Sequence, residues 1–326
     1  MPSILDPPPP EVAADLAGLK AALDAAIPPR VLDRNLLIAT WNIRAFGDLT
    51  EKWQSGTGDS PKRDLHSLLC IAEILSRFDV VALQESRASL KALRHTLKAL
   101  GRNWGLILTD VTEGQAGNGE RLAFVFDTRR VRPSGLACEL VVPEERLAQV
   151  GADALRRQFA RTPYAVSFEA GGKTFILITL HVLYGDAPAD RVAELKTIAG
   201  WMAEWAKDAN SWDHNLIVLG DFNIDRRGDE LYQAFTSTGL KVPDDLNDVP
   251  RTLFSDPRKP DTAHFYDQIA WFLDAAGAPM LSMMFLKGGG FDFSTACLRN
   301  RTLTRDALSW HISDHFPLWA EFGVRD

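Results

Sequence analysis

Seven polar side chains that can bind metal ions or transfer protons stand where apolar stretches of the sequence end. They are Asn42, Glu85, His181, Asp221, Asn223, Asp314 and His315. An acidic side chain at the mouth of a buried strand costs free energy of desolvation unless it is paired or metal-bound. If these strand ends converge, three carboxylates share one cleft, and close like charges resist joint ionisation. A divalent cation is the expected compensation, and a ligand set of carboxylate and amide oxygens favours Mg²⁺ or Mn²⁺ over zinc.

Taken singly, each of these residues is more typical of an ordinary structural role. An asparagine after a strand is most often a turn residue. The aspartates of the GDFN and SDH segments are of a kind that commonly accepts backbone hydrogen bonds. A lone histidine such as His181 is more often a core residue than a catalytic one. The chemical hypothesis therefore depends on the whole set meeting in space.

The elements that must position these residues follow from the hydrophobic periodicity. Helices are predicted for residues 11–26, 63–77, 88–100 and 190–207. Strands are predicted for residues 36–43, 80–84, 106–109, 122–126, 136–142, 164–168, 175–180, 216–219, 268–273, 279–285 and 318–322. Residues 53–64 and 242–261 are rich in turn formers and are predicted to be surface loops. Mixed strands with helices laid outside predict an α/β sandwich of two packed sheets.

The bulk composition fits one soluble globular domain with a short N-terminal extension. The chain has 326 residues, 46% of them hydrophobic, and a net charge of −7. That charge argues against a protein that coats nucleic acid by electrostatics alone, because such binding neutralises many phosphates. We expect residues 1–35 to form a proline-rich tail, disordered over 1–10, and an amphipathic helix packed on the outside. Residues 36–326 form the expected catalytic domain.

The cysteines and the N-terminus predict a cytoplasmic protein. Cys70, Cys138 and Cys297 are odd in number, far apart and without CxxC spacing, which is typical of reduced thiols rather than a disulfide framework or a zinc site. The first ten residues lack the basic-then-apolar pattern of a signal peptide. No apolar run approaches membrane-spanning length, so no membrane association is expected. The sequence indicates no obligate protein partner.

Five segments resemble, in order and spacing, the motif blocks of the endonuclease/exonuclease/phosphatase superfamily. They are WNIRAFG (41–47), VVALQES (80–86), ITLHVLYG (178–185), VLGDFNID (218–225) and ISDHFPL (312–318). Within the superfamily the chain is most similar to deoxyribonuclease I, through GERLAFVF (119–126), FARTPYAV (159–166), FYDQIAW (265–271) and FDF (291–293). The resemblance spans about residues 36–323. It implies a four-layered α/β sandwich, two mixed sheets flanked by helices, that hydrolyses phosphodiesters with Mg²⁺ or Mn²⁺.

The resemblance also implies which residues hold metal. Glu85 would be the principal ligand, with Asn42 and Asp314 nearby. Asp221 and Asn223 would hold a second metal or the scissile phosphate. The number of metals stays open at this point.

The resemblance also implies which residues transfer protons. His181 and His315 would be the acid–base pair, oriented by Glu120 and Asp267 respectively. An unperturbed pKa of about 6.5 lets one histidine accept a proton while the other donates one near neutral pH. We assign His315 as base and His181 as acid, with the reverse arrangement, or Asp221 as base, left open.

Three arginines match positions that contact the substrate in the family. Arg161 matches one that contacts phosphate, and Arg44 and Arg87 match two that touch the DNA strand. The chain departs from deoxyribonuclease I in the 53–64 loop, in residues 142–158, and at Gly119, where the family has an aromatic residue that packs in the minor groove. Four further basic residues are best interpreted as a solvated face, with a phosphate-binding rim as the alternative: Lys62, Arg63, Arg226 and Arg227.

Three functions are compatible with these observations. The first is a nuclease, most simply an endonuclease that cleaves DNA. The second is a phosphatase or phosphodiesterase acting on a small molecule or lipid headgroup, like the sphingomyelinases and inositol polyphosphate phosphatases. The third, a binding module without activity, is disfavoured because every expected catalytic position is filled.

Overall fold

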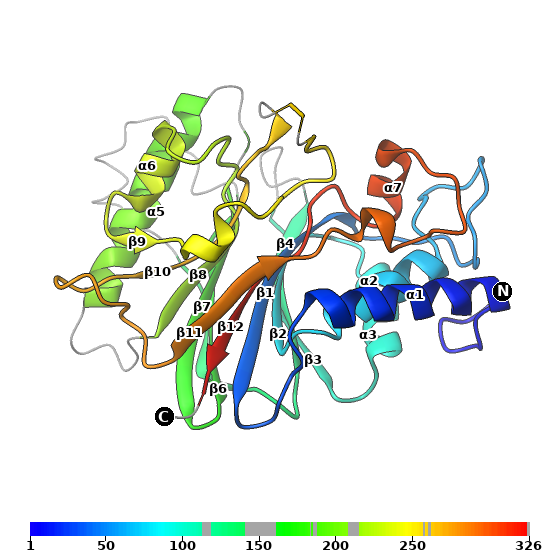
Figure 1. Cartoon of the computed structure of the whole chain (residues 1–326), viewed down its shortest axis with the longest axis horizontal. Coiled ribbons are helices and arrows are strands. Elements are labelled where there is room, and N and C mark those ends of the chain that lie inside the picture. Colours follow the sequence, from blue (N-terminus) through cyan, green and yellow to red (C-terminus); the bar gives the residue numbers. More distant parts are fainter. Residues whose placement is uncertain are drawn as a thin grey trace.

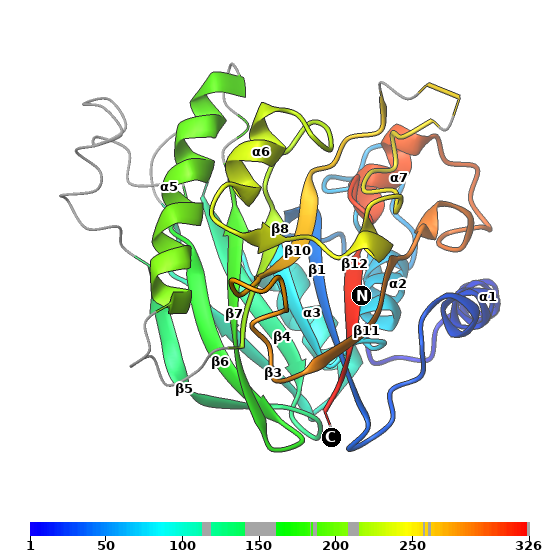
Figure 2. The same cartoon turned by 60° about the vertical axis from the view of Figure 1, so that its left-hand side comes forward.

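Two β-sheets packed face to face form the centre of the molecule, and helices cover their outer faces (Figure 1). The computed structural model describes residues 1–112, 119–140, 161–182, 184, 188–207, 215–256, 258–259 and 262–324. Figure 2 shows α5 and α6 on the side of one sheet and α1 and α2 on the opposite side. The predicted four-layered α/β sandwich is confirmed.

The first sheet has six strands and is built around a parallel pair. Its order is β11 (Met284–Gly290), β12 (Leu318–Gly323), β1 (Asn35–Phe46), β2 (Val80–Arg87), β4 (Glu120–Asp127) and β3 (Trp104–Leu108). β1 runs parallel to β2, so that Asn42 lies opposite Gln84. The carboxyl ends of these two strands, with Asn42 and Glu85, therefore lie at the same edge of the sheet.

The second sheet also has six strands, and three of them place chemical groups side by side. Its order is β5 (Arg132–Glu139), β6 (Tyr164–Ala170), β7 (Lys173–His181), β8 (Leu216–Asp221), β10 (Asp267–Phe272) and β9 (Leu240–Lys241). In the parallel pair β7–β8, His181 lies opposite Asp221. In the antiparallel pair β8–β10, Asp267 lies opposite Asp221. The register alone therefore brings two carboxylates and an imidazole into one row.

Alternation along the strands separates two apolar layers. On β1, Leu36 and Ile38 belong to the cluster between the sheets, whereas Leu37, Ala39 and Trp41 belong to the cluster beneath the helices. The helices on that side are α1 (Pro10–Ala26), α2 (Leu65–Leu75) and α3 (Lys91–Leu100). The second sheet is covered by α5 (Pro188–Lys207) and α6 (Glu230–Thr236). No helix in the described ranges is long and apolar enough to cross a membrane.

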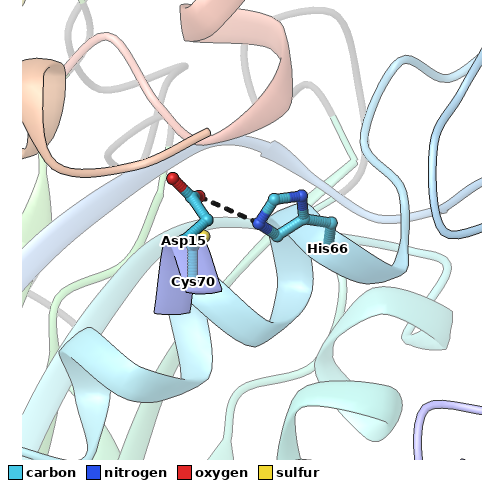
Figure 3. Close-up of side chains that lie close together, drawn as sticks. All are labelled: Asp15, His66 and Cys70. Atoms are coloured by element: carbon cyan, nitrogen blue, oxygen red, sulfur yellow. Dashed lines mark hydrogen bonds and ion pairs between the residues drawn. The ribbon is translucent and has the colours of Figure 1, made fainter. Parts of the chain in front are cut away.

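The N-terminal helix is fastened to the domain by a buried polar contact (Figure 3). Asp15 of α1 lies 3.0 Å from Nε2 of His66 on α2, and its other oxygen accepts from the Arg299 main-chain nitrogen. Ile4 is buried in the same layer, so the expectation of disorder over residues 1–10 is wrong. An apolar side chain there packs against the domain, which offsets the entropy of ordering the tail.

Most predicted elements are present within a few residues of their expected ends. The strand predicted at 279–285 is displaced, because pairing with β12 begins only at Met284 and continues to Gly290. The predicted strand 136–142 extends beyond the described residues at its end. Among the described residues, two helices were missed, α6 and α7 (Arg305–His311). Each has only seven residues, which is too short for a helical period to show.

Candidate active site

The two sheets meet through a hydrogen bond between predicted site residues. The side-chain nitrogen of Asn42, on β1, donates to Oδ2 of Asp221, on β8, over 2.9 Å. Both side chains are buried. Asn223 follows in the turn after β8, where its main-chain nitrogen donates to Asp221 Oδ1 over 2.9 Å and its amide nitrogen donates to the Val182 carbonyl over 2.6 Å. The Asp221 carboxylate is thus held from both sheets.

Two histidine–carboxylate pairs face this carboxylate from different directions. His315 Nδ1 lies 2.7 Å from Asp267 Oδ2, and His181 Nδ1 lies 3.0 Å from Glu120 Oε2. The Nε2 atoms of the two imidazoles lie 3.9 Å and 3.6 Å from Asp221 Oδ2. Because each Nδ1 is occupied by a carboxylate, each Nε2 is left for chemistry near Asp221. The structure therefore brings all five residues together.

The surrounding charges set the protonation of these groups. Burial lowers the pKa of His315, but Asp267 and Asp221 raise it more, and the net result lies well above the usual value. Burial raises the pKa of Glu120, but His181 and then Arg161 outweigh it and bring it to about 2. Asp221 keeps a lowered pKa because the two histidines offset its burial. An ionised carboxylate between two cation-capable imidazoles is the stable arrangement.

Oxygen donors with unmet hydrogen-bonding capacity lie on the first-sheet side. Asn42 Oδ1 and Asp314 Oδ1 are both buried and have no hydrogen-bond partner among the described residues. Such atoms cost free energy unless a ligand satisfies them. Glu85 lies on β2, the strand next to that of Asn42, where its Oε2 accepts from the Ala45 main-chain nitrogen over 2.8 Å and its backbone adopts a φ of 59°. Carboxylate and amide oxygens of this kind fit Mg²⁺ or Mn²⁺.

Two of the three expected arginines gather around Glu120. Arg161 Nε lies 2.5 Å from Glu120 Oε2, and Arg87 Nη1 lies 3.2 Å from Glu120 Oε1. Arg87 also lies 3.2 Å from Glu85. The third, Arg44, lies 4.0 Å from Asp314 on the other side of the site. Positive charge therefore borders the carboxylates at both ends of the site.

One residue that the sequence did not single out organises the site. The hydroxyl of Ser313 donates to the Asn42 carbonyl over 2.7 Å and accepts from the main-chain nitrogens of Arg44 and His315, each over 3.1 Å. It therefore ties β1 to the loop that carries Asp314 and His315. Its position in the SDH segment, directly before Asp314 and His315, was the feature of the sequence that could have identified it.

Arg63 is buried, so the prediction that it belongs to a solvated face is wrong for this residue. Its side chain is only 2% exposed and donates to the main-chain carbonyls of Arg44, Ala45, His311 and Ile312. Burial lowers its pKa to about 10. Arg63 thus cross-links the strand that carries Arg44 to the loop before Asp314, and nothing in its sequence neighbourhood indicated that it points inward.

Within the described part of the chain, two groups of side chains have ligand atoms within 4.8 Å of one another, close enough to share a metal ion. One comprises Asp221, Asp267 and His315, where Asp267 is already engaged by His315. The other comprises Asp15, His66 and Cys70 beneath α1 (Figure 3). Both Asp15 oxygens there accept hydrogen bonds, so that group is satisfied without a metal.

Comparison with known proteins identifies the family. The model of the Endonuclease/Exonuclease/phosphatase family matches residues 39–315. The chain belongs to this family. It is therefore a hydrolase acting on phosphoester bonds, and the family match covers every residue of the site described above.

Individual relatives are distant. A deoxyribonuclease from Thioalkalivibrio sp. (strain K90mix) is 29% identical over 213 residues, which is 64% of this chain but only 51% of that protein. Deoxyribonuclease-1 from Sus scrofa is 27% identical over 319 residues, covering 94% of this chain and 97% of that one. A mannosyl-6-phosphatase from Bacteroides thetaiotaomicron shares the fold, with a TM-score of 0.56 and 20% sequence identity. The match covers 88% of this chain and 99% of that one.

Proposed function

We propose that this chain is a Mg²⁺- or Mn²⁺-dependent endonuclease that cleaves DNA by hydrolysis. The observation that carries the proposal is the pair of histidine–carboxylate dyads whose Nε2 atoms face Asp221 from two sides. Hydrolysis of a phosphodiester needs one group to take a proton from water and another to give a proton to the leaving oxygen. Two oriented imidazoles at one carboxylate supply both.

The residues divide the reaction between them. His315, held by Asp267, takes the proton of the attacking water at Nε2. His181, held by Glu120, gives a proton from Nε2 to the leaving oxygen. Each step is a general acid–base contribution of about 10²–10⁴-fold. Asp221 stabilises the positive charge that develops on either ring.

The metal site in this proposal comprises Glu85, Asn42 and Asp314, with Asp221 and Asn223 as further ligands or phosphate contacts. The two unpartnered buried oxygens, on Asn42 and Asp314, support that assignment. When bound, the cation supplies charge neutralisation at the non-bridging phosphate oxygens. Arg161, Arg87 and Arg44 add positive charge around the same phosphate.

A groove lined by basic side chains, which follows Arg87 directly in the chain, favours a polymer over a small substrate. It has a volume of about 510 Å³ and lies along α3, directly after Arg87. Its basic side chains are Lys91, Arg94, His95 and Lys98. A groove of this kind suits the sugar-phosphate backbone beyond the scissile bond. The relatives named deoxyribonuclease support the same substrate.

A phosphatase acting on a small molecule is the second candidate, favoured by the net charge of −7 and by the fold shared with a mannosyl-6-phosphatase. The two are separated by incubating the protein with supercoiled plasmid and, in parallel, with a panel of sugar phosphates, choline phosphodiesters and inositol phosphates. We expect nicking of the plasmid with Mg²⁺ or Mn²⁺, none with EDTA, and none by His315→Ala. Release of phosphate or choline phosphate with the plasmid intact would select the second candidate.

We also propose a cytoplasmic location. Support comes from Cys70 and Cys297, which are buried as free thiols, and from Cys138, which is also free. Cell fractionation with thiol labelling of the denatured protein tests it: three labelled thiols in the cytoplasmic fraction are expected. Recovery outside the cytoplasm would contradict the proposal.

A further inference from the structure

Exposed aromatic side chains gather around the active site. Among the described residues, the exposed ones are Tyr184 (55%), Trp310 (44%) and Phe254 (42%). Tyr184 lies three residues after His181, and Trp310 lies four residues before Asp314. Phe254 follows Leu253, whose main-chain nitrogen donates to the Asp314 carbonyl over 2.8 Å. Single exposed aromatic residues are common on protein surfaces, but three bordering one catalytic site indicate a ligand with planar apolar faces.

Trp310 is held in a fixed position relative to the catalytic carboxylates. The guanidinium carbon of Arg44 lies 3.8 Å from the centre of the Trp310 ring. Arg44 is itself tied on two sides, because Nη1 donates to the hydroxyl of Ser309 over 2.5 Å and Nε lies 4.0 Å from Asp314 Oδ2. Arg44 thus covers one face of the indole, while the ring remains substantially open to solvent.

A second aromatic surface lies on the side of the other sheet. The ring of Tyr266 is 5.5 Å from the ring of His315 and stacks on His264 at 4.5 Å with an interplanar angle of 7°. Arg191 lies 4.8 Å from the ring of Tyr184. The metal and proton-transfer groups are therefore bordered by an aromatic surface with an associated arginine on each side.

We propose that Trp310, backed by Arg44, is a nucleobase-stacking subsite, and that the enzyme cleaves an unpaired strand faster than a duplex. This inference rests on the proposed nuclease function. In a duplex the faces of each base are covered by its neighbours, so an indole stacks more readily on an unpaired base, where no neighbour must be displaced. Stacking also binds without many phosphate contacts, which suits a chain with a net charge of −7.

The test measures the cleavage of intact and abasic strands by the wild type and by variants of Trp310. Trp310→Ala, Trp310→Phe and a control, Met284→Ala, are assayed on a single-stranded oligonucleotide, its duplex and the same strand with an abasic tract. Met284 is also exposed but lies on β11 opposite Gly323, far along β12 from Asp314. We expect Trp310→Ala to lower kcat/KM on the unpaired strand by ~5- to 150-fold, mainly through KM, as for one stacked base. Trp310→Phe should retain most of the activity, and Met284→Ala all of it.

The abasic strand separates stacking from a structural role. On that strand the wild type should lose about the factor that Trp310→Ala loses on the intact strand, and the variant should lose nothing more. An equal effect of Trp310→Ala on intact and abasic strands would overturn the inference, as would cleavage of the duplex by the wild type as fast as of the free strand. No cleavage of any nucleic acid by the wild type would instead overturn the proposed function, and this inference with it.

Discussion

Replacing Glu120 with glutamine should weaken the folded state by a predictable amount. The carboxylate is buried against Arg161, His181 and Arg87, at 2.5, 3.0 and 3.2 Å. These contacts outweigh burial and bring its pKa from 4.5 to about 2. At about 1.4 kcal/mol for each tenfold change in the ionisation constant, this corresponds to about 3 kcal/mol of stability at neutral pH. The same range is expected when one partner of a buried ion pair is removed.

The dependence on pH distinguishes this charge effect from a packing defect. Because the folded-state pKa is depressed, the stabilisation is fully present above pH 4.5 and is lost as the pH falls toward 2. The difference between wild type and Glu120→Gln should therefore be about 3 kcal/mol at pH 7 and roughly half that at pH 3. Urea unfolding followed by tryptophan fluorescence measures it, since urea is uncharged and does not screen ion pairs.

Glu169→Gln is the matched control. Glu169 pairs with Arg132 at 2.8 Å, but both side chains are accessible, at 34% and 73%. An exposed pair of this kind contributes about 0–1 kcal/mol. Equal effects of the two substitutions, or a Glu120→Gln difference that does not shrink as the pH falls, would refute the reasoning.

Further substitutions probe the site and the N-terminal anchor. Glu85→Gln should abolish metal-dependent turnover and weaken Mg²⁺ binding in calorimetry while circular dichroism stays unchanged; retained turnover would remove Glu85 from the metal site. His181→Ala and His315→Ala should each lower kcat by at least ~10²-fold in the plasmid assay, and a smaller loss would argue against their proton-transfer roles. Asp15→Asn should lower the free energy of unfolding by about 3 kcal/mol, because a buried partner of His66 is lost. Burial lowers the pKa of His66, but Asp15 and Cys70 together raise it more, to about 9. The contribution of Asp15 should therefore be full below pH 6.5 and disappear as the pH rises through 9; a loss constant from pH 6 to 10 would contradict it.

Much of the fold was determined by local sequence patterns. The continuous apolar run from Leu36 to Ala39 predicts a strand, and the structure shows that this strand, β1, is buried on both faces. Long periodic segments such as α5 were predicted for the same reason. The motif at Glu85 and Asn42 also places polar residues at strand ends without any tertiary information.

Only the tertiary structure decided how distant residues meet. The family resemblance implied that Glu120 meets His181, but no local pattern did; strand order and register set that contact and place Asp267 opposite Asp221. Periodicity reports which face of a strand is buried but not which strands are neighbours. Arg63 shows the same limit. Its charge predicts a solvent-exposed side chain. The side chain is nevertheless buried, because four main-chain carbonyls from two separate segments accept its hydrogen bonds.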